Sequence, residues 1–97
     1  MAQTPEGKVK DKIKKILKAN NVYFAMPMGT GYGNAGVPDF LCCFGGRFLA
    51  IEAKAAGGKP TALQMKNIAE IEACGGAAWV VDELNVNLFE LYIKANL

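Results

Sequence analysis

The chain has 97 residues, of which 52% are hydrophobic and 21% are charged, with a formal net charge of +2 and no histidine. This composition excludes a disordered chain, and the length predicts one small domain over residues 1–97. No stretch reaches the roughly 18 apolar residues of a membrane span, and residues 1–10 lack the apolar run of a signal peptide. We therefore expect a cytoplasmic protein without a membrane partner.

The chain has three cysteines, an odd number, and their spacing is not that of a metal site. They are Cys42, Cys43 and Cys74. Because no histidine is available to complete a ligand set, a zinc site is disfavoured. We predict that all three are small buried apolar residues.

The first predicted element is a helix over residues 5–19. Thr4 and Pro5 form an N-cap followed by proline at the first helical position, and Asn20-Asn21 ends the helix. Glu6 falls on or beside the apolar face, either as a favourable charge at the helix N-terminus or as a site residue. The apolar face consists of Val9, Ile13, Ile16 and Leu17.

This helix is also rich in lysine. Six lysines fall within eleven residues, and Asp11 is the one acid among them. The run is either a solvated helix face or a surface for a polyanion, and charge alone does not decide between the two. The six are Lys8, Lys10, Lys12, Lys14, Lys15 and Lys18.

Residues 22–26 predict a first strand, because they are β-branched and aromatic. The following MGTGYGNAG is a glycine-rich loop that lacks the Gly-Lys-Ser/Thr of a P-loop. Tyr32 and Asn34 in this loop are candidates to face a ligand. Residues 37–44 and 47–54 then predict a hairpin that turns at Gly45-Gly46.

Thr61 opens a second helix over residues 62–73, and residues 77–81 predict a short strand that is buried on both faces. A last helix over residues 86–95 is expected to bury Leu88, Leu91 and Tyr92. The order αβββαβα predicts an α/β fold, in which helices flank a mixed four-stranded sheet. The unit around the second helix should be a right-handed parallel crossover.

Three charged residues stand out in the apolar hairpin. Alternation along the strand puts Glu52 and Lys54 on one face, and Leu49, Ile51 and Ala53 on the other. Asp39 lies about six residues before the Gly45-Gly46 turn, and Glu52 about six after it. The two carboxylates are therefore expected nearly opposite each other.

Two carboxylates this close repel unless a cation lies between them, and oxygen ligands without histidine or cysteine suit Mg²⁺ or Mn²⁺. A neighbouring Lys54 can orient a water and stabilise charge on a phosphoryl oxygen. This chemistry favours phosphodiester hydrolysis. The simpler alternative is a Glu52–Lys54 ion pair on an exposed sheet face, which does not explain why Asp39 converges there.

Pro38-Asp39, twelve residues and then Glu52-Ala53-Lys54 resemble the PD-(D/E)xK nuclease signature. GVPDF, GRFLAIEAK and GGKPTALQ are more narrowly similar to the VRR-NUC family, in its stand-alone phage and prophage form, over about residues 6–81. The resemblance implies a restriction-endonuclease-like core and a homodimeric DNA endonuclease that leaves 5′-phosphate and 3′-hydroxyl ends. It also implies branched substrates such as four-way (Holliday) junctions, and the cytoplasm of a bacterial host if the protein is phage-encoded.

The resemblance also implies roles for single residues. Asp39 and Glu52 would be metal ligands together with the backbone carbonyl of Ala53, and Lys54 would be the catalytic lysine. Gln64 would face the site, although Thr61-x-x-Gln64 is also a capping box. The first-helix acid, Glu6, would assist the metal site directly or through water. Contacts with DNA are assigned to Lys8, Lys12, Lys15 and Lys59.

Two other functions stay open. A restriction-type nuclease would cut specific linear duplexes, but 97 residues leave little room for recognition elements. A non-catalytic nucleic-acid-binding module would use the lysine-rich helix, but it has no need of two acids facing a phosphate. For the homodimer, we expect the interface on an exposed apolar part of the last helix or on the hairpin.

Overall fold

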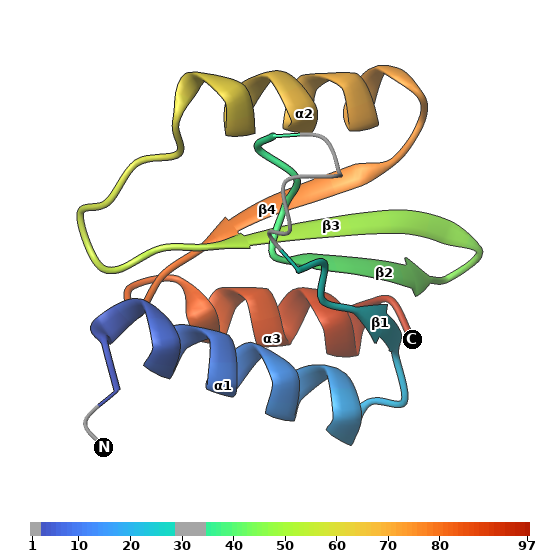
Figure 1. Cartoon of the computed structure of the whole chain (residues 1–97). Helices are drawn as coiled ribbons and strands as arrows, with labels where there is room; N and C mark the ends of the chain where they lie inside the picture. Colours follow the sequence, from blue (N-terminus) through green and yellow to red (C-terminus); the bar gives the residue numbers. More distant parts are fainter. Residues whose placement is uncertain (1–2, 29–34) are drawn as a thin grey trace.

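The computed structural model of the chain describes residues 3–28 and 35–97, and there its elements follow the predicted order αβββαβα (Figure 1). The helices are α1 (Pro5–Ala19), α2 (Ala62–Ala73) and α3 (Val86–Ala95). The strands are β1 (Tyr23–Ala25), β2 (Phe40–Phe44), β3 (Arg47–Ala53) and β4 (Ala77–Val81). The predicted α/β fold is confirmed, and it is consistent with a restriction-endonuclease-like core.

The four strands form one mixed sheet in the order β1-β2-β3-β4. β2 is antiparallel to β1 and to β3, whereas β3 and β4 are parallel, as expected for strands joined through a helix. Gly45 and Gly46 form the β2–β3 turn with φ of 60° and 74°, a backbone conformation that glycine adopts without strain. α2 covers one face of the sheet, and α1 and α3 cover the other (Figure 1).

The helices and β4 have the predicted bounds, whereas β1 and β2 are shorter than expected and β3 ends at Ala53 instead of Lys54. Val22 is excluded from β1 because its N–H is bonded to the carbonyl of Leu17 at the end of α1. β2 begins at Phe40 rather than at residue 37, and Pro38 has no N–H to contribute to a sheet. Among the described residues, no helix is long and apolar enough to cross a membrane.

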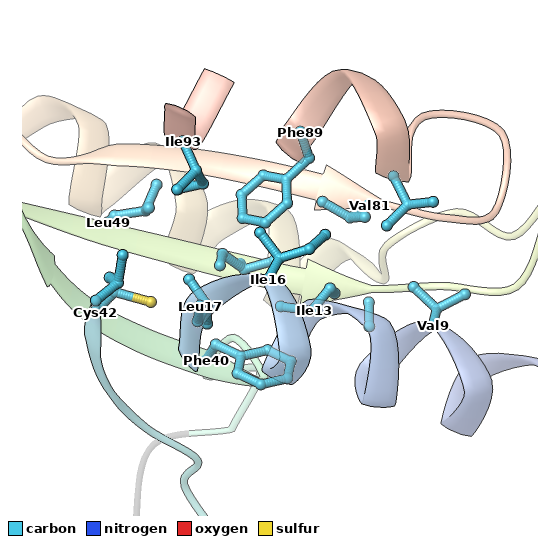
Figure 2. Packing of buried hydrophobic residues seen from close by; sticks show 14 residues of the cluster. Val9, Ile13, Ile16, Leu17, Phe40, Cys42, Leu49, Val81, Phe89 and Ile93 are labelled. Atoms are coloured by element: carbon cyan, nitrogen blue, oxygen red, sulfur yellow. The ribbon is translucent and has the colours of Figure 1, made fainter. Parts of the chain in front are cut away.

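The hydrophobic core lies between the sheet and the pair α1 and α3 (Figure 2). Leu49, Ile51 and Ala53 of β3 point into it and are buried, as the alternation predicted. Helical spacing places a matching apolar stripe of α1 against them. This stripe consists of Val9, Ile13, Ile16 and Leu17.

The prediction for the buried face of α3 was wrong. Leu88 and Leu91 are 60% and 63% exposed, and Tyr92 is half-buried. α3 carries apolar residues around most of its circumference, so its sequence offers two stripes with helical spacing. The buried stripe is the one that contains Phe89, whose ring packs on Trp79 with ring centroids 5.5 Å apart. The residues of α3 that the fold buries are Val86, Phe89 and Ile93.

The prediction for the cysteines was right for one and wrong for two. Cys42 is buried, and burial raises the pKa of its thiol to about 12, so the thiol is protonated at neutral pH. Cys43 is exposed because the next residue in a strand points to the opposite face of the sheet. Cys74 is exposed because it lies at the C-terminal end of α2.

Residues 29–34 of the glycine-rich loop lie outside the described part of the chain. The expectation that Tyr32 and Asn34 face a ligand therefore falls on residues that the structure does not describe.

Candidate active site

The β2–β3 hairpin brings two carboxylates together at one end of the sheet. Phe40 is opposite Ile51 in the strand register, so one step further Asp39 is opposite Glu52. The N–H of Ala53 donates to Oδ2 of Asp39 at 2.9 Å and holds this carboxylate beside β3. The structure therefore confirms that Asp39 and Glu52 lie opposite each other, as expected from their equal distances from the Gly45-Gly46 turn.

Glu52 is a buried acid with an incomplete set of partners. Its side chain is 2% exposed. Oε2 accepts a hydrogen bond from Nε2 of Gln64 at 2.9 Å and lies 3.5 Å from Nζ of Lys54. Oε1 is buried and has no hydrogen-bond partner among the described residues. A buried polar atom without a partner is unfavourable, so this oxygen marks a place that suits a cation or a proton.

The pKa of Glu52 reflects this environment. Burial, followed by the negative charge of Asp39, raises the pKa from its ordinary value of 4.5 to about 7. The charge of Lys54 acts in the opposite direction and lowers it. Since desolvation dominates, the carboxyl group holds its proton over an unusually wide pH range in the absence of a cation.

Gln64 has two structural roles at the start of α2. Its Oε1 accepts the N–H of Thr61 at 2.8 Å, and its own N–H donates to Oγ1 of Thr61 at 3.2 Å, which completes a capping box. Its Nε2 remains free to donate to Glu52. The helix cap thereby orients the amide that faces the acid, so the two readings of Gln64 are compatible.

The segment before Asp39 is held against the first turns of α2. Gly36 has a φ of +78°, and a Cβ at this position would lie 2.6 Å from the carbonyl carbon of Leu63. Nδ2 of Asn67 also donates to the carbonyl of Ala35 at 2.9 Å. Only glycine permits so close an approach, which places Asp39 and Gln64 at the same end of the sheet.

Glu6 reaches the site through a lysine that the sequence analysis did not single out. Nζ of Lys10 lies 3.5 Å from Oε2 of Glu6 and 3.6 Å from Oδ1 of Asp39. Lys10 thus connects α1 to the acidic pair instead of sharing the solvated face of the helix. Its position four residues after Glu6 was the available signal, because residues with this spacing lie on one helix face.

The structure places the three α1 lysines assigned to DNA away from the acidic pair. Lys8 and Lys12 line a hollow that also contains Glu83, and Lys12 and Lys15 line a second hollow with Glu90. By helical spacing they lie on the flank of the α1 core stripe opposite to that of Lys10. Lys59 is exposed in the loop between β3 and α2.

The residues at this position fit a divalent cation. Asp39 and Glu52 lie opposite each other in the strand register and are the candidate side-chain ligands. Among residues 3–28 and 35–97 there is no group of three or more His, Cys, Asp or Glu side chains that could hold a metal. Within an extended strand, the N–H and C=O of one residue point the same way, so the carbonyl of Ala53 is directed toward Asp39. Two carboxylates and a carbonyl are hard oxygen donors of the kind Mg²⁺ and Mn²⁺ prefer.

We predict that Glu52→Gln makes the stability less dependent on pH. The pKa of Glu52 is higher in the folded than in the unfolded chain, so the stability of the wild type should fall as the pH rises from about 4.5 to about 7. In EDTA, the free energy of unfolding of the variant should exceed that of the wild type by on the order of 2–3 kcal/mol at about pH 8. At about pH 4 the two free energies should be almost equal. Urea unfolding at both pH values measures this.

The matched control is Glu70→Gln, which neutralises an exposed acid on α2. It should change the free energy of unfolding by the same small amount at both pH values. A gain for Glu52→Gln that is equal at both pH values would contradict the prediction.

Comparison with known proteins places this fold beside a solved structure. No family model and no curated protein sequence matches the chain. A solved structure described as a "VRR_NUC domain protein" superposes with a TM-score of 0.67 and 17% sequence identity, and the match covers 97% of this chain and 92% of that chain. At this level of identity the likeness shows that the two chains share a fold over nearly their whole lengths.

Proposed function

We propose that the chain is a nuclease that hydrolyses phosphodiester bonds in DNA with Mg²⁺ or Mn²⁺. The observation that carries the proposal is the buried Glu52, one oxygen of which has no partner among the described residues, although Asp39 and Lys54 adjoin it. A simple Glu52–Lys54 ion pair would explain the position of Oε2 but would leave Oε1 without a partner. A cation between the two carboxylates would relieve both the repulsion and the missing contact.

The proposed metal ligands are Asp39, Glu52 and the carbonyl of Ala53. A metal bound there would polarise the scissile phosphate and lower the pKa of the attacking water. The chain itself supplies rigidity, because Ala53 lies in a buried strand and its N–H holds one oxygen of Asp39. Water and a substrate phosphate would complete the ligand set.

Lys54 is proposed as the catalytic lysine. Its ammonium group, 3.5 Å from Glu52, is close enough to orient the attacking water and to stabilise charge on a phosphoryl oxygen. Gln64 positions the Glu52 carboxylate through its 2.9 Å hydrogen bond. Glu6 would assist from α1 through its contact with Lys10, and through water.

Two further observations support this assignment. The hairpin and the start of α2 carry the GVPDF, GRFLAIEAK and GGKPTALQ segments that resemble the VRR-NUC family. The solved structure with the same fold is described as a VRR_NUC domain protein. On this basis we propose that residues 1–97 form one nuclease domain that acts on branched DNA such as four-way junctions.

The first test is cleavage of labelled linear duplex, single strand and four-way junction in Mg²⁺, Mn²⁺ or EDTA. We expect cleavage of the junction with either metal and none in EDTA. Glu52→Gln and Lys54→Ala should each reduce the rate by about 100-fold or more, a typical loss for a catalytic group. Glu70→Gln and Lys66→Ala remove the same charges from exposed positions on α2 and should cut normally.

The same assay distinguishes the rival functions. Binding of DNA without cleavage in any metal would favour a non-catalytic module. Efficient cleavage of linear duplex at one sequence would favour a restriction-type enzyme. Unchanged rates in Glu52→Gln or Lys54→Ala would show that the catalytic centre lies elsewhere.

Four exposed lysines are proposed to contact the DNA backbone: Lys8, Lys12, Lys15 and Lys59. Lys59 follows β3 by a few residues, at the end of the sheet that carries Glu52, so DNA that reaches the site would pass close to it. The three lysines of α1 are farther along the surface and are accompanied by Glu83 and Glu90, which reduce the local positive charge.

Salt dependence tests these contacts in the Glu52→Gln background, where the DNA should stay intact. Each lost phosphate contact with a duplex should reduce the slope of log K against log salt concentration by about 0.9. We expect this for Lys59→Ala and for the double change Lys12→Ala and Lys15→Ala. The control Lys18→Ala, also on α1, should leave the slope unchanged. An unchanged slope for the double variant would show that Lys12 and Lys15 belong to a solvated helix face and do not contact DNA.

The homodimer is proposed to form through the exposed leucines Leu88 and Leu91 of α3, together with the exposed Leu84 in the turn before this helix. Beside Leu91, Glu90 and Lys94 pair with each other at 3.5 Å, so these two charges offset each other. Two copies can therefore meet there without repulsion between like charges. α2 lies across the sheet from α3 (Figure 1). Because Glu52 is bonded to Gln64 of α2, both sites would remain accessible in such a dimer.

Light scattering after size exclusion tests the dimer. We expect the mass of two chains for the wild type, and the mass of one chain for Leu88→Asp or Leu91→Asp with an unchanged circular dichroism spectrum. Leu63→Asp introduces the same charge at an exposed leucine of α2 and should remain dimeric. A monomeric wild type, or dimeric Leu88→Asp and Leu91→Asp, would contradict the proposed interface.

A further inference from the structure

Lys10 has two acidic partners and no assigned function. Its ammonium group lies 3.5 Å from Oε2 of Glu6 and 3.6 Å from Oδ1 of Asp39, and its side chain is 33% exposed. The Asp39 side chain is less exposed, at 22%. Lys10 therefore reaches Asp39 from α1, which lies on the face of the sheet opposite to α2 (Figure 1).

The two proposed ligands differ in how well the protein satisfies them. Asp39 has the Ala53 N–H at Oδ2 and Lys10 at Oδ1, so both of its oxygens are occupied. Glu52, by contrast, has an oxygen without a partner among the described residues. A cation can approach Glu52 at no loss of a protein contact, but it competes with Lys10 for Asp39.

The local charge favours this competition. With every group ionised, Glu6, Asp39 and Glu52 contribute three negative charges and Lys10 and Lys54 two positive ones, a local sum of −1. A divalent cation on Asp39 would raise the sum to +1 and repel the ammonium group of Lys10. The lysine side chain is long and flexible, and an ammonium group binds phosphate as a point charge.

We propose that Lys10 substitutes for the metal at Asp39 in the metal-free protein, and binds a phosphate of the DNA strand once the metal displaces it. This inference rests on the proposed function, because it requires a divalent cation at Asp39 and Glu52. It makes Lys10 a substrate-binding residue that becomes available when the metal is bound. DNA binding and metal binding are then coupled through one side chain.

The alternative is that Lys10 serves as a structural contact that orients Asp39. The two ideas predict opposite signs for metal affinity. If Lys10 competes with the metal, its removal strengthens metal binding. If Lys10 orients Asp39, its removal weakens metal binding because the carboxylate loses a support.

The test is a calorimetric titration of the full chain with MnCl₂ in the absence of DNA. Lys10→Met should bind Mn²⁺ on the order of fivefold more tightly than the wild type, because a nearby positive charge is removed. Lys14→Met, one turn further along α1, removes the same charge at a greater distance and should stay within about twofold of the wild type.

A second measurement tests the transfer of Lys10 to DNA in the Lys54→Ala background. Adding Lys10→Met should weaken junction binding several-fold in Mn²⁺, and much less in EDTA, where Lys10 is engaged by Asp39. An equal loss in both conditions would overturn the inference.

The outcomes separate this inference from the proposed function. Mn²⁺ affinity of Lys10→Met that is equal to or weaker than that of Lys14→Met would overturn the role of Lys10 alone. Absence of Mn²⁺ binding in the wild type and both variants would overturn the proposed function, and this inference with it.

Discussion

A buried carboxylate beside a second carboxylate is the constraint on which the rest of this structure depends. Glu52 is almost inaccessible to water, yet it has one oxygen without a partner among the described residues and a pKa raised to about 7. Such an arrangement destabilises a small domain at neutral pH unless a cation is bound. Perturbed carboxyl groups of this kind are concentrated at functional sites, which is why the unfavourable contact is informative.

One face of β3 contributes to the hydrophobic core, and the other carries the charged residues of the candidate site. Leu49, Ile51 and Ala53 enter the core beneath the sheet, where α1 and α3 bury them. Glu52 and Lys54 point to the other face, toward the start of α2. The core therefore holds the strand rigidly while its opposite face carries charge, which is the support that a preorganised site needs.

α2 stabilises the fold in a different way from the other two helices. Of its side chains, Ile68 is the buried one, whereas α1 and α3 each bury several. Its first turn nonetheless orients Gln64 toward Glu52 and packs against Gly36. The capping box thus does more than begin a helix, because it also determines where one polar group of the site lies.

α1 uses its circumference for three purposes. One stripe enters the core, one flank carries Glu6 and Lys10 toward Asp39, and the other carries Lys12 and Lys15 beside α3. A period of 3.6 residues separates these surfaces even though the lysines are almost contiguous in sequence. The lysine run is therefore not one surface, and a count of charges in the sequence cannot reveal the division.

The sequence by itself determined the order of the elements, the bounds of the helices, the hairpin turn and the opposition of Asp39 to Glu52. These follow from caps, glycine turns and strand alternation, which act between residues close in sequence and have few stereochemical solutions. Only the tertiary structure decided which stripe of α3 is buried and where Lys10 points. Those outcomes depend on how elements distant in sequence dock, and α3 offers two apolar stripes between which local pattern cannot choose.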